Sequence, residues 1–498
     1  MLDFNTMKRQ IFLFIILAFL SSACSRLDLL PISEKSTGGF YKTEAHINQA
    51  LMGAYNGLRS AWVTSQASYM LTESRSDNAF QGQEYNDGPI SRFEVTPDLA
   101  ILNTAWENYY SYIQRCNEIL EALDGVEMSD EARRQYEGEA RFLRGLFYFD
   151  LVRLFGAVPV VTTTLTIDES YQVTRSNVED VYTQVEADLT AAVDYLPQHY
   201  DADNIGRATT WAARGYLGKV YLFMSGYPLH ANRWEDARTQ FKEVIDAGVF
   251  EFFADYAAIY DQKNEGGKQQ VFSIPFATDQ DGNGNPYPTR NASNDVAPVS
   301  FAEGGVPFGG SPFNLFLSRD VVAAYEPADK RKDVSILASW LHKSGETITT
   351  LPTTRKYQNG PVTRANDWDI DWIALSYTDV LMMYAEVLNE QGYQSAGEAF
   401  AILNDVRQRA GLEAKTAADV PNQEAFRRWV EAERRVEFAF ENLRWFDLVR
   451  TDRALDVMRD FLSEYGLGGN VKSRDQYIYP IPQAVLNMTP QLGQNPGY

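Results

Sequence analysis

The sequence has few of the residues on which several common protein chemistries depend. It contains only two cysteines and four histidines among 498 residues. Two cysteines cannot form a disulfide framework, and four scattered histidines leave little material for histidine-based catalysis. The chain also lacks the motifs Gly-x-Ser-x-Gly, His-Glu-x-x-His and Gly-x4-Gly-Lys-Ser/Thr. These absences count against a serine hydrolase, a zinc peptidase and a P-loop nucleotide-binding protein.

Positive charge and long apolar runs are also scarce. The chain has 45 Lys and Arg against 67 Asp and Glu, a formal net charge of -22. A polyanion such as nucleic acid would be repelled by this excess of negative charge. Beyond the N-terminus no apolar run is long enough to cross a bilayer as a helix. Hydrophobic residues still make up 45% of the chain, which is ample for a large core.

The N-terminus has the features of a secretion signal that ends at a cysteine. The basic pair Lys8-Arg9 precedes the apolar run Ile11–Leu20, and three small residues then lead to Cys24. This order is typical of a secretory signal, and the apolar run is too short to span a membrane. Because a cysteine would become the first mature residue, the segment resembles a bacterial lipoprotein signal. We therefore expect residues 1–23 to be removed and lipid on Cys24 to anchor the chain to a membrane; the alternative is an uncleaved or lipid-free signal.

Apolar residues recur every three to four positions over much of the chain, which places them on one side of a helix. This periodicity predicts helices over residues 46–61, 103–123, 130–155, 176–196, 206–226, 234–248, 378–392, 396–411 and 433–450. In two helix pairs the second helix has Ala-x3-Phe near its start, as Ala237/Phe241 and Ala396/Phe400. This pattern is similar to a tetratricopeptide (TPR) repeat, in which a small residue lets paired helices approach closely. The predicted fold class is therefore mostly α, built on a TPR-like helix-pair scaffold.

Residues from about 250 to 361 differ from the rest of the chain. Gly, Pro and Asn are frequent there, and only short apolar runs such as Val271–Phe276 suggest strands. We expect an irregular, loop-rich insertion containing short strands, the kind of region where binding residues tend to lie. A long loop is also expected over Ser74–Pro97, and the Pro-rich C-terminus is expected to lie extended over the body.

The stretch Glu433–Arg450 combines apolar periodicity with charges of opposite sign three residues apart. The possible ion pairs are Arg434/Glu437, Glu441/Arg444, Arg444/Asp447 and Asp447/Arg450. We interpret the stretch as one helix packed between other helices, with its charges joined in a network, because burying an unpaired charge is costly. Its segment Phe446–Arg450 repeats Phe149–Arg153, which predicts two similar packing sites, one in each half of the chain.

Several segments, taken in order, resemble the SusD/RagB family. They are LRGLFYFDLVRLFGAVPVV, VYTQVEADLTAAVDYLP followed by GRATTWAARGYLGKVYL, YAEVLNEQG with LNDVRQRAGL, ERRVEFAFENLRWFDLVR, and the ending YPIPQ to QNPGY. The resemblance runs from Cys24 to Tyr498. It divides the chain into a signal peptide (1–23), an N-terminal SusD-like helical region (24–225) and a C-terminal SusD/RagB region (226–498) that includes the loop-rich insertion.

The resemblance also implies a location and partners. It implies a lipoprotein of the outer membrane that faces the cell exterior and captures oligosaccharides. It further implies a SusC-like TonB-dependent transporter as the partner that receives the cargo and over which the lipoprotein sits as a lid. Peptides are an alternative cargo in this family.

Sugar recognition uses flat aromatic faces together with amide or carboxylate groups. Loop regions that offer both supply the candidate ligand-binding residues Trp62, Tyr69, Asp77, Asn78, Phe80, Tyr85, Tyr287, Arg290, Trp340, Trp368 and Trp372. For any single aromatic residue the competing interpretation is local packing in the core, because buried aromatics outnumber binding ones. The cluster is therefore a stronger prediction than any of its members.

Two acidic stretches have part of a calcium-binding pattern. Residues 279–284 alternate oxygen ligands and then have glycine, but position twelve is Arg290, where a bidentate Glu is required. Asp367, Asp369 and Asp371 also alternate carboxylates, without a turn glycine. Calcium at either stretch is the alternative to a solvated acidic turn, and we expect no metal and no cofactor.

The sequence thus predicts a non-enzymatic, lipid-anchored glycan-binding protein of the outer membrane. One competing hypothesis is a TPR-like lipoprotein scaffold whose concave face binds only protein. A less favoured one is a glycoside hydrolase, which needs two carboxylates about 5 to 10 Å apart. Nothing in the sequence singles out such a pair among the 67 acidic residues.

Overall fold

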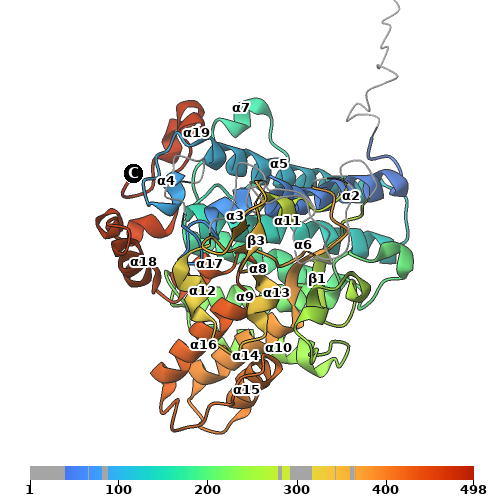
Figure 1. Ribbon diagram of the computed structural model, residues 1–498. Coiled ribbons are helices and arrows are strands. Elements are labelled where there is room, and N and C mark those ends of the chain that lie inside the picture. The colour runs from blue at the N-terminus through green and yellow to red at the C-terminus, as the bar shows by residue number, and fades with distance from the viewer. Residues whose placement is uncertain are drawn as a thin grey trace, which may run out of the picture.

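The computed structural model describes residues 40–65, 67–80, 88–278, 283–291, 317–342, 344–358, 364 and 366–498. This part of the chain is mainly helical, with a few short strands, as the sequence predicts (Figure 1). No helix among these residues is long and apolar enough to cross a membrane.

Long helices of the N-terminal half form one layered group. They are α2 (Glu44–Arg59), α5 (Ala100–Ala122), α6 (Asp130–Phe155), α8 (Val178–Tyr195) and α9 (Thr210–Ser225). Helix α6 lies at the centre of the group and contacts α2, α5 and α8, and α8 in turn contacts α9. Short helices connect them, namely α3 (Ala67–Leu71), α4 (Gly88–Ser91) and α7 (Ile167–Ser170), with a π-helical turn at Ser60–Thr64 after α2.

A second group of helices continues from α9. It comprises α10 (Trp234–Asp246), α14 (Tyr377–Gln391), α15 (Glu398–Arg409) and α16 (Gln423–Glu437). Helix α10 packs on α9 and α14, and α14 packs on α15 and α16. A Cβ atom at Gly218 of α9 would lie 2.6 Å from the Phe241 ring of α10, so glycine permits this close approach. The TPR-like prediction is therefore confirmed.

The loop-rich insertion holds short elements, as predicted. Strand β1 (Gln270–Ile274) pairs antiparallel with β6 (Trp372–Ser376), with two irregularities in register. Two-residue strands pair as β2 (Ile336–Leu337) with β5 (Thr353–Thr354) and β3 (Trp340–Leu341) with β4 (Thr347–Ile348). The helices here are α11 (Tyr287–Arg290), α12 (Arg319–Ala324) and α13 (Arg331–Ser335). The C-terminal part adds α17 (Arg444–Arg450), α18 (Ala454–Ser463) and α19 (Gln483–Met488).

The prediction of one helix over 433–450 is wrong. Helix α16 ends at Glu437 and α17 begins at Arg444, because Phe440 and Asn442 between them have φ values of 67° and 65°. Such left-handed residues end a helix. The backbone N–H groups of both donate to the buried carboxylate of Glu73, at 3.0 and 3.1 Å, which replaces the helical acceptors.

The two copies of the segment FDLVR meet in one place. In each copy the Asp and Arg three residues apart form an ion pair, Asp150 with Arg153 and Asp447 with Arg450. The Arg153 guanidinium lies 4.0 Å from the Phe446 ring of the other copy. Both arginines also lie over the ring of Phe223 in α9, at 5.2 and 5.6 Å. The repeat therefore builds one shared site between the two halves, where the sequence predicts two separate ones.

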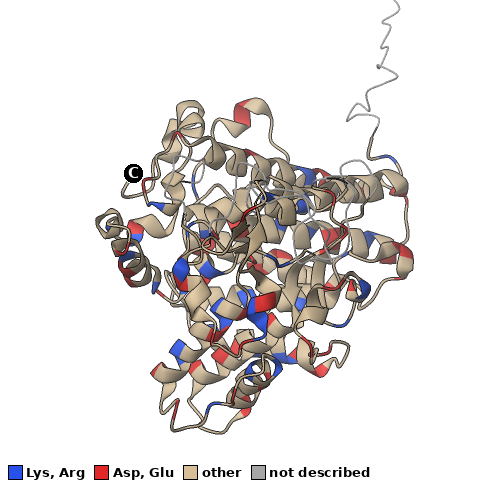
Figure 2. Cartoon of the chain, viewed as in Figure 1, with Lys and Arg blue, Asp and Glu red and all other residues tan. Residues whose placement is uncertain are grey.

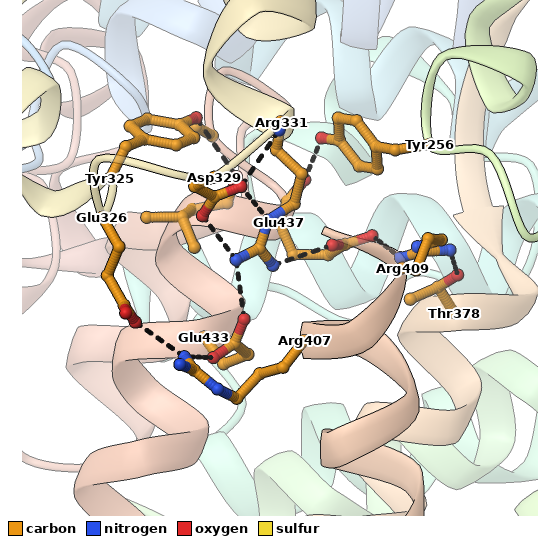
Figure 3. A network of polar contacts seen from close by, with 12 residues as sticks. Tyr256, Tyr325, Glu326, Asp329, Arg331, Thr378, Arg407, Arg409, Glu433 and Glu437 are labelled. Atoms are coloured by element: carbon orange, nitrogen blue, oxygen red, sulfur yellow. Dashed lines mark hydrogen bonds and ion pairs between the residues drawn. The ribbon is translucent and has the colours of Figure 1, made fainter. Parts of the chain in front are cut away.

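A network of buried charges joins α13 and α15 to one side of α16 (Figure 3). Figure 2 shows acidic and basic positions close together where α13 and α16 meet. The buried members of the network are Asp329, Arg331, Arg407, Arg409, Glu433 and Glu437. Arg331 contacts the carboxylates of Asp329, Glu433 and Glu437 at 2.7, 2.7 and 3.1 Å. Burial alone would raise the pKa of Glu437, but Arg409 and Arg331 hold it below its ordinary value.

The four ion pairs predicted within 433–450 are mostly replaced by more distant ones. Only Asp447 pairs with Arg450 as predicted. Arg444 instead contacts Asp77 at 2.8 Å, and Arg434 contacts Asp379 at 2.7 Å. The predicted network exists, but its partners come from other parts of the chain.

A group of carboxylates lies beside the β1–β6 pair. Glu265 accepts the backbone N–H of Asp371 at 2.8 Å, and the Asp371 carboxylate accepts from the Phe276 N–H at 3.0 Å. Burial, together with the charges of Asp371 and Asp369, raises the pKa of Glu265 to about 8. Burial also raises the pKa of Asp371 to about 6.

We predict that Glu437→Ala destabilises the fold strongly. The change would leave Arg331 and Arg409 buried without this carboxylate, which costs about 3–5 kcal/mol in comparable buried pairs. Urea denaturation followed by circular dichroism measures the loss in the free energy of unfolding. Glu251→Ala removes an exposed ion pair with Lys268 and should cost no more than about 1 kcal/mol. Equal losses for the two variants would contradict a structural role for the network.

We also predict a pH-dependent effect of Glu265→Gln. A carboxyl whose folded pKa is raised binds its proton more tightly in the folded state, so it lowers stability as pH rises from its ordinary pKa of 4.5 to about 8. Relative to the wild type, the variant should therefore gain about 1–2 kcal/mol between pH 5 and 8.5, a value reduced for solvent screening of this partly exposed group. Denaturation at several pH values measures the gain. Glu243→Gln on α10 is the control, and a pH-independent difference for Glu265→Gln would contradict the prediction.

Candidate functional site

Seven of the eleven predicted ligand-binding residues lie inside the protein. These buried residues are Tyr69, Asp77, Asn78, Tyr287, Trp340, Trp368 and Trp372. Two of these tryptophans use their indole N–H groups within the protein. Trp368 Nε1 donates to Thr289 at 2.9 Å, and Trp340 Nε1 donates to the Leu351 carbonyl at 2.6 Å. A buried ring offers no face on which a sugar can stack. These residues therefore do not form the exposed platform that the sequence predicts.

The buried aromatics of the insertion pack on one another. The rings of Tyr357 and Trp372 are stacked at 4.9 Å between centroids, and Tyr287 lies 4.7 Å from Trp372. The Tyr287 hydroxyl donates to the Phe440 carbonyl, between α16 and α17. Local packing, the competing interpretation in the sequence, describes this cluster.

Asp77 and Asn78 join the N-terminal half to α16 and α17. The Asp77 carboxylate contacts Arg444 at 2.8 Å and Arg435 at 3.1 Å. Burial alone would raise the pKa of Asp77, but Arg444 and Arg435 lower it to about 2. Asn78 donates to Glu73 at 2.8 Å and accepts from Arg435 at 2.9 Å. Both side chains are thus occupied by structural contacts.

Three further predicted residues are only partly buried. Trp62 donates to Asp150 and lines a narrow pocket of about 60 Å³, which suits a few water molecules and not a sugar. Phe80 stacks on Tyr465 at 3.6 Å between centroids, and Arg290 donates to the Thr64 carbonyl. Tyr85 and the lipidation residue Cys24 lie outside the described residues.

The two acidic stretches give no described metal site. Residues 279–282 of the first stretch lie outside the described residues. In the second, Asp371 accepts from Phe276 and Ser273, and Asp367 accepts from Thr278 at 3.2 Å. In the described part of the chain, no group of three or more His, Cys, Asp or Glu side chains could hold a metal ion.

An open groove runs along the outer face of α2, and we name it the α2 groove. Its volume is about 430 Å³, within the range of small-molecule binding sites. One wall is the face of α2 that carries Asn48, Met52, Tyr55, Asn56 and Arg59, and the other is the loop 203–207. Residues Phe272–Pro275, from β1 and its end, close the groove.

The α2 groove combines amides with exposed apolar side chains. Asn56 is exposed, Met52 is 40% exposed and Ile205 is 60% exposed. At one end Arg59 lies 4.6 Å from the Phe276 ring and donates to Asn283 at 2.8 Å. Burial raises the pKa of Tyr55, so its hydroxyl stays neutral and accepts from the Ala208 N–H at 2.9 Å. Asp203 and Arg207 also line the groove, and Arg207 is paired with Glu139 at 2.9 Å. Amides beside apolar surface are the groups that recognise the hydroxyls and rings of uncharged sugars.

The α2 groove is not among the sites that the sequence predicts, although the helix itself is. The apolar periodicity predicts the core face of α2, and Ile47, Leu51 and Leu58 on that face are buried. The polar residues Asn48, Asn56 and Arg59 also share one side of the helix, at spacings of eight and three residues. That signal was available, but the opposing loop 203–207 is brought near only by the tertiary fold.

Comparison with known proteins covers nearly the whole chain. Residues 27–222 match a SusD-like family model described as starch-binding and associating with the outer membrane, and residues 329–498 match the SusD family model. SusD-like protein P25 of Formosa agariphila is 24% identical over 97% of both chains. A SusD homologue of Bacteroides thetaiotaomicron superposes with a TM-score of 0.80, at 24% identity, over 93% of this chain and 98% of its own.

A further solved structure is slightly more similar in sequence. Surface glycan-binding protein A of Bacteroides uniformis has a TM-score of 0.76 and 26% identity, over 91% of this chain and 99% of its own. The family models, the relatives and the shared fold agree with the order of segments seen in the sequence. This chain belongs to the SusD/RagB family.

Proposed function

We propose that the protein is a cell-surface lipoprotein that binds oligosaccharides in the α2 groove and delivers them to a SusC-like TonB-dependent transporter. The likeness over nearly the whole chain to a surface glycan-binding protein carries this proposal. The family model described as starch-binding and associating with the outer membrane supports it. The lipoprotein-like signal that ends at Cys24 supports the membrane anchor.

Binding in the α2 groove needs no covalent chemistry. The amide of Asn56 can exchange hydrogen bonds with sugar hydroxyls, and Met52 and Ile205 can cover the apolar face of a pyranose. Asn48 can donate through its Nδ2, because its Oδ1 already accepts from Arg207. From Asn48 to Arg59 the helix face extends about 16 Å, so several contacts can act along one oligosaccharide. Each neutral hydrogen bond contributes only about 1 kcal/mol, and a cargo held by such bonds can be released to a transporter.

We expect a soluble form of the chain that lacks the signal and Cys24, Ser25 to Tyr498, to bind a neutral oligosaccharide saturably without cleaving it. Calorimetric titration against α-glucan and β-glucan oligomers and peptides, with product analysis of the same samples, checks both points. Binding heat with the peptides and with none of the glycans would show that the cargo is a peptide. Hydrolysis products that disappear with one carboxylate substitution would establish a glycosidase, and no binding to any probe would favour the protein scaffold.

We predict that Asn56→Ala weakens binding of that oligosaccharide about fivefold, because it removes one neutral hydrogen-bonding group of the α2 groove. The same titration measures the change. Asn487→Ala on α19 removes an exposed amide outside the groove and should leave the affinity unchanged. Equal affinities for the wild type and Asn56→Ala would place the ligand elsewhere.

We predict that Cys24→Ala releases the protein from the membrane fraction. The substitution removes the residue to which the lipid would be attached, and no described helix could take over as a membrane span. Fractionation of cells that express each form, followed by immunoblotting, measures the shift. Tight membrane association of the variant would contradict the lipid anchor.

A further inference from the structure

A second groove lies between α16 and the linker that joins α9 to α10, and we name it the α16 groove. Its volume is about 410 Å³. One face of α16 lines it from Glu424 to Arg434, a length of about 15 Å. The other walls come from the end of α14, from the linker and Trp234 at the start of α10, and from the end of α17 with Arg453 before α18. None of the residues of the α2 groove takes part.

The carboxylates of the α16 groove are all occupied by arginines. Glu386 accepts from Arg450 at both oxygens, and Glu390 accepts from Arg427 at both. The remaining four are Glu424, Glu431, Asp447 and Asp452, and each oxygen of these also lies within 3.4 Å of an arginine nitrogen. Few carboxylate oxygens of the groove therefore remain to accept hydrogen bonds from a ligand.

The donors of the groove are not all used. Arg434 is buried, with Nε on Asp447 at 2.9 Å and Nη1 on Asp379 at 2.7 Å, while its Nη2 has no recorded partner in the described chain. Arg453 donates only through Nε, to Glu431 at 3.2 Å, so both of its terminal nitrogens stay available among the described residues. Arg428 reaches only Glu424, at 3.4 Å, and within the described ranges the indole N–H of Trp234 has no partner.

This surplus of donors points to an anionic ligand. A guanidinium with two free nitrogens matches the geometry of a carboxylate or a sulfate, and such charge-assisted bonds are stronger than neutral ones. The whole chain carries a net charge of -22, so general electrostatic attraction would not draw an anion to it. The lining of the groove holds six carboxylates and five guanidiniums, so the selection of an anion rests on the directed free donor nitrogens and not on net charge.

The walls of the groove favour a sugar over a peptide. They are formed by helices and a short linker, whose main-chain groups are largely bonded within their own elements, and no strand edge lines the groove. An extended peptide would therefore find no ladder of main-chain partners. Trp234 lines the same groove as Arg434 and Arg453 and supplies an aromatic ring, which suits the apolar face of a sugar residue.

We propose that the α16 groove binds an acidic saccharide, one whose carboxylate or sulfate accepts from Arg453 and from Nη2 of Arg434 while its ring packs on Trp234. The inference rests on the proposed function as a glycan-binding protein. It adds to the α2 groove, which suits neutral sugars, a separate site that selects charge.

The test compares acidic and neutral probes on the soluble form, Ser25 to Tyr498, by calorimetry. The probes are trigalacturonate, a sulfated chondroitin tetrasaccharide, neutral galactotriose and an acetylated tetraglutamate peptide. The double variant Arg428→Gln/Arg453→Gln should bind the acidic saccharides at least about tenfold more weakly than the wild type, because it removes the free charged donors of the rim. Arg434 is left intact because it also pairs with buried carboxylates. Arg134→Gln, an exposed arginine of α6, is the matched control and should change nothing.

The outcomes separate the two grooves. Trp234→Ala should weaken the acidic saccharides, whereas Asn56→Ala should weaken only the neutral oligosaccharide bound in the α2 groove. Added salt should weaken the acidic probes more than the neutral ones. Thermal unfolding confirms that each variant is folded.

Equal affinity of the wild type and the double variant for the acidic probes would overturn the acidic site, as would binding of the peptide alone. Neutral binding without acidic binding would overturn this inference and leave the proposed function standing. Failure of every saccharide would overturn both.

Discussion

The carboxylate of Glu437 lies between two arginines that come from different parts of the chain. Arg331 precedes the short strands of the insertion, and Arg409 ends α15. Removing such charges from water is so costly that each must meet its partners at once, and a partial set would be less stable than none. The network can therefore form only when the irregular insertion and the helical scaffold are docked together. The insertion has few regular main-chain hydrogen bonds, and the network fixes its position on the helices.

Much of the helical scaffold could be predicted because apolar periodicity and capping residues within each segment determine where a helix begins and ends. Helix α6 begins and ends where the periodicity places it, with Ser129 as its N-cap and Gly156 at φ 73° directly after its last residue. The break between α16 and α17 could not be predicted, because its cause is Glu73, 367 residues away from Phe440. The ion pairs follow the same rule. Asp447 and Arg450 are three residues apart, and the sequence correctly predicts their ion pair. The partners of Arg444 and Arg434 are set by tertiary contacts.

The candidate site was harder to predict than the fold, for a reason that the aromatics show. Trp368 and Tyr287 stand among Gly, Pro and Asn, a composition that indicates irregular backbone but says nothing about burial. An irregular segment still needs a core, and these two side chains supply it, each 1% exposed with its polar atom bonded inside. The α2 groove shows the converse. Periodicity reveals which face of α2 is buried, but only the folded chain determines that residues 203–207 stand opposite the other face.

The two grooves differ in how closely they depend on the stability of the fold. Asn56 and Ile205 of the α2 groove are exposed and take no part in the buried networks, so their side chains can change without unfolding the protein. In the α16 groove, Arg434 is held by Asp447 and Asp379, and a guanidinium fixed through two nitrogens presents the third in a set direction. The contacts that stabilise the fold therefore also set the direction of the free nitrogen of Arg434. Arg453 and Arg428 lie at the exposed edge of the groove and pair only with Glu431 and Glu424 among the described residues, so their side chains can change without disturbing the buried network.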